Sequence, residues 1–111
     1  MHALTRHTGG MLHVIGTTAA GLSGLASAQL QLVDGAAVIA APSRLHHELS
    51  ASVQLLNTDQ PQAAIEALVL EVAAGRSAVL LASGDPLWFG IGRMLLQHFS
   101  AEQLRFHPCP C

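Results

Sequence analysis

The residues best suited to chemistry stand together in one stretch, SGDPLWFGIGR, from Ser83 to Arg93. This stretch follows a short apolar run and combines a carboxylate, a rigid turn and three glycines. Gly84 has no side chain, so a ligand can approach the backbone closely there. Pro86 fixes the turn, and the Asp85 carboxylate can accept hydrogen bonds from a hydroxyl or ammonium group. The spacing is therefore compatible with a ligand site at the end of a strand.

The same residues also suit a plain helix start. Asp85 is a favoured N-cap residue, and Pro86 is a favoured first residue of a helix. Local chemistry alone favours this helix cap, and a cap and the lip of a binding site can share one turn.

A second glycine-bearing loop, GTTAAG at residues 16–21, also follows an apolar run. It is not a dinucleotide-binding fingerprint, because Thr18 stands where G-x-G-x-x-G requires glycine. It also lacks the Lys-Ser/Thr pair of a phosphate-binding loop. We therefore expect a ligand that is not held by its phosphates.

The histidines and cysteines predict no metal site. His46 and His47 are adjacent, so they do not easily share one metal. His107, Cys109 and Cys111 supply three ligand types near the last residue, with no fourth nearby in the sequence.

Length and composition predict one folded domain. The chain has 111 residues, of which 50% are hydrophobic and 11% charged, so disorder is not expected. Its five basic residues are scattered arginines and its formal net charge is −2, which argues against nucleic-acid binding. No apolar stretch is suited to spanning a membrane.

The chemistry-bearing loops must be positioned by alternating strands and helices. We predict strands at 11–16, 36–41, 77–83 and 102–108, helices at 23–35, 61–75 and 87–99, and a helical turn at 44–49. Residues 1–10 are expected to form a loose leader before a domain spanning 11–111. Strands that are short and continuously apolar predict an α/β fold, with a parallel sheet covered by helices on both faces. Ligands bind such sheets beyond the carboxyl ends of the strands, where both glycine loops stand.

LASGDPLWFGIGRMLLQHF resembles the Gly-Asp-Pro motif of the tetrapyrrole methylases. It is most similar to the branch that methylates C5 of precorrin-6Y or cobalt-precorrin-7 in cobalamin biosynthesis. LHVIGTTAAGLSGLASAQLQLVDGAAVIAAPSRL is similar to the family's first strand, loop, helix and second strand. The chain departs from the family at Thr18-Ala19-Ala20, where Gly-Pro-Gly is usual, and it ends at HPCPC, where the family continues into a second domain.

The resemblance implies a cytoplasmic methyltransferase that uses S-adenosylmethionine as methyl donor and a precorrin as substrate. It implies a cofactor cleft between this N-terminal domain and a C-terminal methylase domain that is missing here. Arg44 would face the carboxylates of the tetrapyrrole, and no catalytic base is assigned. The cofactor residues implied are Gly16, Ala19, Ser83, Gly84, Asp85 and Trp88.

Two other functions remain open at this stage. The chain could be a truncated half-domain that folds, forms a homodimer and has no turnover. It could instead be a secreted protein, because Ala26-Ser27-Ala28 matches a signal-peptidase site. Other tetrapyrrole methylases and diphthine synthase also remain alternatives within the superfamily.

Overall fold

The strands form one parallel, five-stranded sheet in the order β3-β2-β4-β1-β5. The structure is a computed structural model that describes residues 10–17, 21–49, 53–83 and 85–107, with the backbone only at 83 and 85–91. The expected leader at residues 1–9 lies outside this description. The strands are β1 (Leu12–Thr17), β2 (Val38–Ala41), β3 (Gln54–Asn57), β4 (Ala78–Ser83) and β5 (Leu104–His107). All strand pairs are parallel, which confirms the α/β fold.

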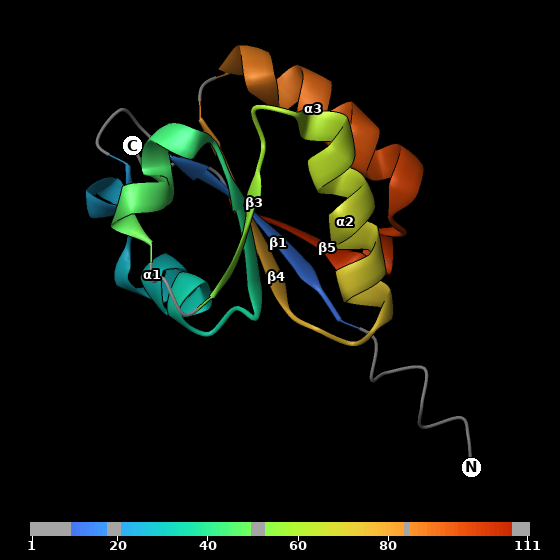
Figure 1. Ribbon diagram of the computed structural model, residues 1–111, viewed down its shortest axis with the longest axis horizontal. Coiled ribbons are helices and arrows are strands. Elements are labelled where there is room, and N and C mark those ends of the chain that lie inside the picture. Colours follow the sequence, from blue (N-terminus) through green and yellow to red (C-terminus); the bar gives the residue numbers. More distant parts are fainter. Residues whose placement is uncertain (1–9, 18–20, 50–52, 84, 108–111) are drawn as a thin grey trace.

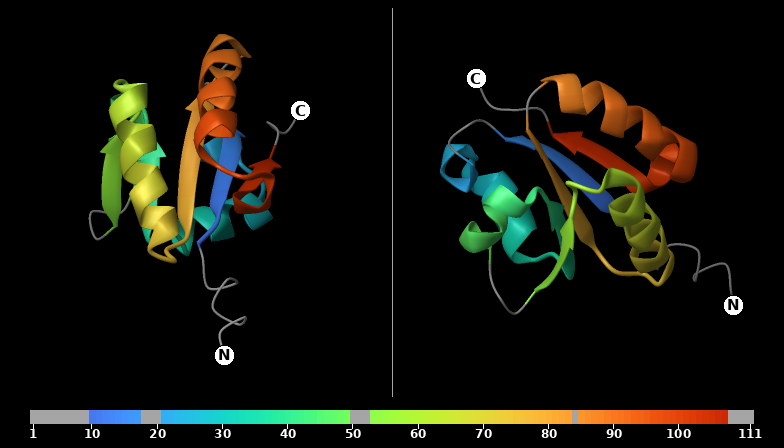
Figure 2. Two further views of the ribbon diagram at one scale, coloured as in Figure 1. Left: turned by 90° about the vertical axis from the view of Figure 1, so that its right-hand side faces the viewer. Right: turned by 45° about the horizontal axis from the view of Figure 1, so that its top comes forward.

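Helices cover both faces of the sheet (Figures 1 and 2). On one face lie α2 (Pro61–Ala73) and α3 (Asp85–His98), which contact each other. On the other face lie α1 (Ser27–Asp34) and the 3-10 helices η2 (Leu22–Gly24) and η3 (Ser43–Glu48). A further 3-10 helix, η4 (Ala101–Gln103), leads into β5. No helix in the described ranges is long and apolar enough to cross a membrane.

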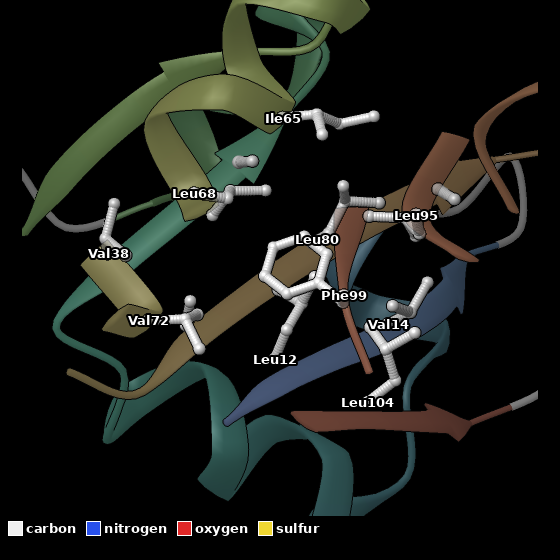
Figure 3. Packing of buried hydrophobic residues seen from close by; sticks show 13 residues of the cluster. Leu12, Val14, Val38, Ile65, Leu68, Val72, Leu80, Leu95, Phe99 and Leu104 are labelled. Carbon is white, nitrogen blue, oxygen red and sulfur yellow. The ribbon is translucent and has the colours of Figure 1, made fainter. Parts of the chain in front are cut away.

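The α2/α3 face contains the larger of two hydrophobic clusters (Figure 3). Leu12 and Leu80 come from the sheet, Leu68 and Leu95 come from the helices, and Phe99 directly follows α3. Each of these side chains is at most 5% exposed. Residues at spacings of three and four along α2 place one apolar stripe of this helix on the strands, and Leu95 of α3 joins the same cluster.

The α1 face contains a second cluster built from the alternate strand residues. Ile15, Ile39 and Leu81 point to this face and pack with Val33 of α1 and Leu45 of η3. Because β2 and β4 carry apolar residues on both faces, their sequences are almost continuously apolar, as predicted.

Two elements differ from the sequence-based prediction. The short strand β3 was missed because it has only four residues at the sheet edge, and Gln54 and Asn57 at its ends are exposed. The predicted helix at 23–35 is instead split into η2 and α1. Ala26 between them has an extended backbone, and its N–H donates to Gln29 Oε1 at 3.1 Å, which caps α1. The start of α2 at Pro61 and the turn at 44–49 are confirmed, the latter as η3.

Candidate functional site

The carboxyl ends of β1 and β4 lie next to each other at the centre of the sheet. In the register of this pair, Gly16 is opposite Ala82 and Thr17 is opposite Ser83. Gly16 and Ser83 are 67 positions apart in sequence (83 − 16), yet they end adjacent strands at one edge. The sequence prediction that both glycine-bearing loops leave the same edge is confirmed.

The chain leaves these two strands toward opposite faces of the sheet. After β1 it crosses to β2 on the face that α1 covers, and after β4 it crosses to β5 on the face that α3 covers (Figure 2). Adjacent strands whose connections diverge in this way form a topological switch point, which is where open parallel sheets bind ligands. The β1/β4 edge is therefore the candidate functional site.

Thr17 fixes the two strand ends to each other. Its side chain is 3% exposed, and its Oγ1 hydroxyl donates to the carbonyl oxygen of Ala82 at 3.3 Å. This bond satisfies a buried hydroxyl and joins the last residue of β1 to the next-to-last residue of β4. Sequence reasoning missed Thr17, because its partner is a backbone atom 65 residues away.

The predicted cofactor residues flank this edge. Gly16 is half-buried near the end of β1, and Ser83 is the last residue of β4. A helix does follow this turn, but Asp85 is its first residue and not the predicted N-cap, so Pro86 is the second residue of α3 and Trp88 lies in its first turn. The side chains of Ser83, Asp85 and Trp88 lie outside the described residues, as do Ala19 and Gly84 altogether.

The predicted substrate residue Arg44 lies in η3, directly after β2, and is exposed. β2 pairs with β4, so η3 begins at the same edge of the sheet as α3. The structure thus places Arg44 at the carboxyl edge but on a different loop from Gly16 and Ser83.

A polar group that the sequence analysis did not single out lies beside Arg44. The Ser43 hydroxyl donates to Asp59 Oδ2 at 2.5 Å, and the Asp59 N–H donates to Asn57 Oδ1 at 2.8 Å. Ser43 follows β2, Asn57 is the last residue of β3, and Asp59 follows β3; the carboxyl ends of these two strands are paired in the sheet. Their pairing could be found only after β3 had been recognised as a strand.

Glu48, at the end of η3, reaches the segment that follows the β1 loop. Its Oε1 accepts a hydrogen bond from the Leu22 N–H at 3.1 Å. Gly21, which precedes Leu22, is buried and has φ +68°, where L side chains are rarely found. A cavity of about 290 Å³ lies on the α1 face of the sheet and has Leu22 and Glu48 in its lining.

The described part of the chain holds no group of three or more potential metal ligands. His107 faces His13 instead, with His107 Nε2 and His13 Nδ1 3.0 Å apart. Burial, the neighbouring His107 and Arg105 lower the pKa of His13 below its usual value. Cys109 and Cys111, the two cysteines near His107 in the sequence, lie outside the described residues.

Comparison with curated proteins finds relatives of a single kind. The chain is 35% identical over 101 residues to a precorrin-6Y C(5,15)-methyltransferase [decarboxylating] from Sinorhizobium sp. The matched region covers 89% of this chain and 24% of that protein. It is 39% identical over 103 residues to the cobalt-precorrin-7 C(5)-methyltransferases of Salmonella typhimurium (strain LT2) and Salmonella typhi, covering 88% of this chain and 49% of each. The chain thus spans about half the length of the Salmonella relatives and a quarter of the Sinorhizobium one. No protein-family model matches the chain.

Proposed function

We propose that the chain forms the N-terminal, cofactor-binding part of a methyltransferase. The premise is that the chain belongs to the precorrin-6Y and cobalt-precorrin-7 C(5)-methyltransferase family. The proposed reaction is the S-adenosylmethionine-dependent methylation of C5 of a precorrin or cobalt-precorrin ring in cobalamin biosynthesis. A cytoplasmic location is part of the same proposal.

The observation that carries this proposal is the switch point between β1 and β4. Gly16 and Thr17 at the end of β1 pair with Ala82 and Ser83 at the end of β4, and the two connections diverge to opposite faces. A ligand at this edge would contact both glycine-bearing loops.

The residues at this edge fit S-adenosylmethionine, a ligand without phosphates. Such a ligand needs close approach to backbone and acceptors for its hydroxyl and ammonium groups. We assign Gly16 and Ala19 to one side of the cofactor. The residues proposed for the other side come from the end of β4 and the start of α3, and they are Ser83, Gly84, Asp85 and Trp88.

When bound, S-adenosylmethionine supplies a methyl group that the nucleophilic ring carbon takes as the C–S bond breaks toward sulfur and the ring later loses a proton. The methyl group is already activated, so the main task of the protein is to orient the two reactants and exclude water. The hydrogen bond between Thr17 and Ala82 serves orientation, because it keeps the two strand ends at a fixed separation. Arg44 is proposed to pair with a carboxylate at the ring periphery.

We further propose that a second α/β domain completes the cleft, since the chain matches about half of the Salmonella relatives. The half-domain alternative shares the cofactor site and differs only in turnover. The secreted-protein alternative is not supported by the fold. Cleavage after Ala28 would remove β1, which lies between β4 and β5 in the sheet.

The proposal can be tested through the fluorescence of Trp88. The chain has one tryptophan and no tyrosine, so its emission reports on the start of α3 alone. Titration with S-adenosylmethionine or S-adenosylhomocysteine should change this emission saturably, whereas ATP at equal concentration should not. Saturable binding of ATP, or no response and no heat of binding with either cofactor form, would contradict the proposed site.

Transfer of a labelled methyl group to a precorrin separates the two remaining possibilities. Cofactor binding with transfer would support the enzyme, and cofactor binding without transfer would support the half-domain. Asp85→Asn is the site variant and Asp34→Asn is the control, because Asp34 is exposed at the end of α1.

A further inference from the structure

We propose that Glu48 is a positioning residue for the cofactor site, acting through the segment that follows the β1 loop. This inference rests on the proposed function but adds a residue from a different loop, outside both glycine-bearing motifs. Glu48 is placed to hold the backbone at Gly21–Leu22 in one conformation.

The first observation is a hydrogen bond between segments far apart in sequence. The Leu22 N–H donates to Glu48 Oε1 at 3.1 Å, across 26 residues. Leu22 is the first residue of η2, and the first N–H groups of a helix lack partners within it. The Glu48 carboxylate therefore supplies an acceptor that the local backbone cannot supply.

The second observation is the fit between this carboxylate and Gly21. A Cβ added to Gly21 would lie 2.7 Å from Glu48 Oε2 and 3.0 Å from Glu48 Oε1. Gly21 also has φ +68° and ψ −137°, a conformation that favours glycine. A backbone of this shape lets the carboxylate approach directly, so Gly21 and Glu48 form one unit.

The third observation is that Thr17 and Gly21–Leu22 are the described residues on either side of the β1 loop. Thr17 is joined to β4 through the Ala82 carbonyl, and Leu22 is joined to η3 through Glu48. The two bonds thus hold the described backbone on both flanks, at Thr17 and at Leu22. Flanks that are held in place before the cofactor binds lose less conformational entropy on binding.

Charge balance around Glu48 leaves its carboxylate available for this bond. The nearest ion pair is loose, with His47 Nε2 4.0 Å from Glu48 Oε2 and the His47 side chain 77% exposed. Oε1, the atom that accepts from Leu22, is not part of that pair. The bond to the backbone is therefore the specific interaction of this side chain.

The test compares Glu48→Ala with Glu48→Gln in the whole chain. Glu48→Ala removes the acceptor, and we expect S-adenosylmethionine to bind about 10-fold more weakly, with faster hydrogen exchange at the Leu22 amide. Glu48→Gln keeps a carbonyl acceptor on a side chain of the same length. It should therefore restore cofactor affinity and Leu22 protection to near the original values.

Glu66→Ala is the matched control, because Glu66 is an exposed carboxylate on α2, on the other face of the sheet. It should change neither cofactor affinity nor exchange at Leu22. Unchanged affinity in Glu48→Ala, or a Gln variant as weak as the Ala variant, would overturn the positioning role.

The exchange measurement keeps this inference separate from the proposed function. If the unaltered chain bound no cofactor, the proposed function and the link to the cofactor would both be contradicted, while Leu22 exchange would still report on the Leu22–Glu48 hydrogen bond. If the chain bound cofactor and Leu22 exchanged equally fast with and without the Glu48 carboxylate, only the positioning role of Glu48 would be contradicted.

Discussion

The two faces of the sheet are built in different ways. On the α2/α3 face, helices of 13 and 14 residues lie on the strands, and buried side chains of α2 and Leu95 of α3 pack against them. On the other face, the only α-helix in the described ranges has 8 residues, and the rest of the layer consists of short 3-10 turns. The first face is held by packing and the second relies also on individual side-chain hydrogen bonds, such as those of Glu48 and Gln29.

This difference separates stability from site geometry. Burial of apolar area is non-directional, so the α2/α3 face can supply stability without fixing the position of any one loop. A hydrogen bond is directional, so the α1 face can fix loop positions while adding little net stability. The connection from β1 to β2 runs on the face with the directional bonds, and the proposed cofactor site lies at the end of β1.

The largest expected effect is a loss of stability on the α2/α3 face. Leu68→Ala truncates a side chain of α2 that is 0% exposed and packed in the larger cluster. We expect the free energy of unfolding to fall by about 2–5 kcal/mol, measured by urea denaturation. Cofactor affinity, measured where the variant is still folded, should change little.

Leu70→Ala is the control for this prediction. Leu70 is on the same helix but is 72% exposed, so its truncation should cost well under the Leu68 value. Equal losses in the two variants would mean that α2 does not pack through the stripe described here.

A smaller loss of stability but a larger loss of affinity is expected on the other face. Leu45 is 2% exposed and anchors η3, the turn that carries Arg44 and Glu48. Leu45→Ala should cost about 2 kcal/mol, near the low end for buried leucines, because a short turn can partly collapse into the space. Affinity for S-adenosylmethionine should fall as well. If Leu45→Ala left affinity intact while Leu68→Ala reduced it, the division of roles between the faces would be reversed.

How much of this could be predicted from sequence depends on the range of each interaction. The strand residues at 12–17, 38–41 and 78–83 are apolar on both faces, so their own composition identified them. The four residues of β3 lie at an edge and carry no such pattern, so their pairing with β2 was not predictable from local sequence.

The site shows the same limit. The positions of Gly16 and Ser83 at strand ends were predictable because each belongs to a glycine-bearing stretch after an apolar run. Thr17 and Glu48 were missed because their partners are backbone atoms 65 and 26 residues away. Such partners are defined only once the strand order is known, and no local spacing marks them.

Gly21→Ala tests the directional side of the comparison at a smaller scale. A side chain at φ +68° and ψ −137° costs about 1–3 kcal/mol, and the added Cβ would also crowd the Glu48 carboxylate. Thermal unfolding should show this loss. The loss should be partly relieved in the double variant Gly21→Ala/Glu48→Ala, because the crowding would then be gone. Strictly additive losses would show that Gly21 and Glu48 are not coupled.

The smallest expected effect is the pH dependence at the outer edge of the sheet, where β1 pairs with β5. His13 and His107 are 3.0 Å apart there, and burial, His107 and Arg105 lower the pKa of His13 in the folded chain. The unfolded chain, with His13 near pKa 6.5, therefore binds the proton more readily than the folded chain does. Stability should be unaffected by His13 above about pH 6.5 and should decline as the pH falls from there through the lower folded pKa.

His13→Gln removes the titrating group but keeps a side chain that can form hydrogen bonds. The decline in melting temperature between about pH 7 and pH 5 should be shallower in this variant than in the unaltered chain. His47→Gln is the control, because the His47 side chain is 77% exposed and does not link two strands. An equally shallow profile for His47→Gln would show that the acid sensitivity does not arise at the β1–β5 edge. A profile in which His13→Gln loses stability more steeply toward low pH would contradict the direction of the pKa change itself.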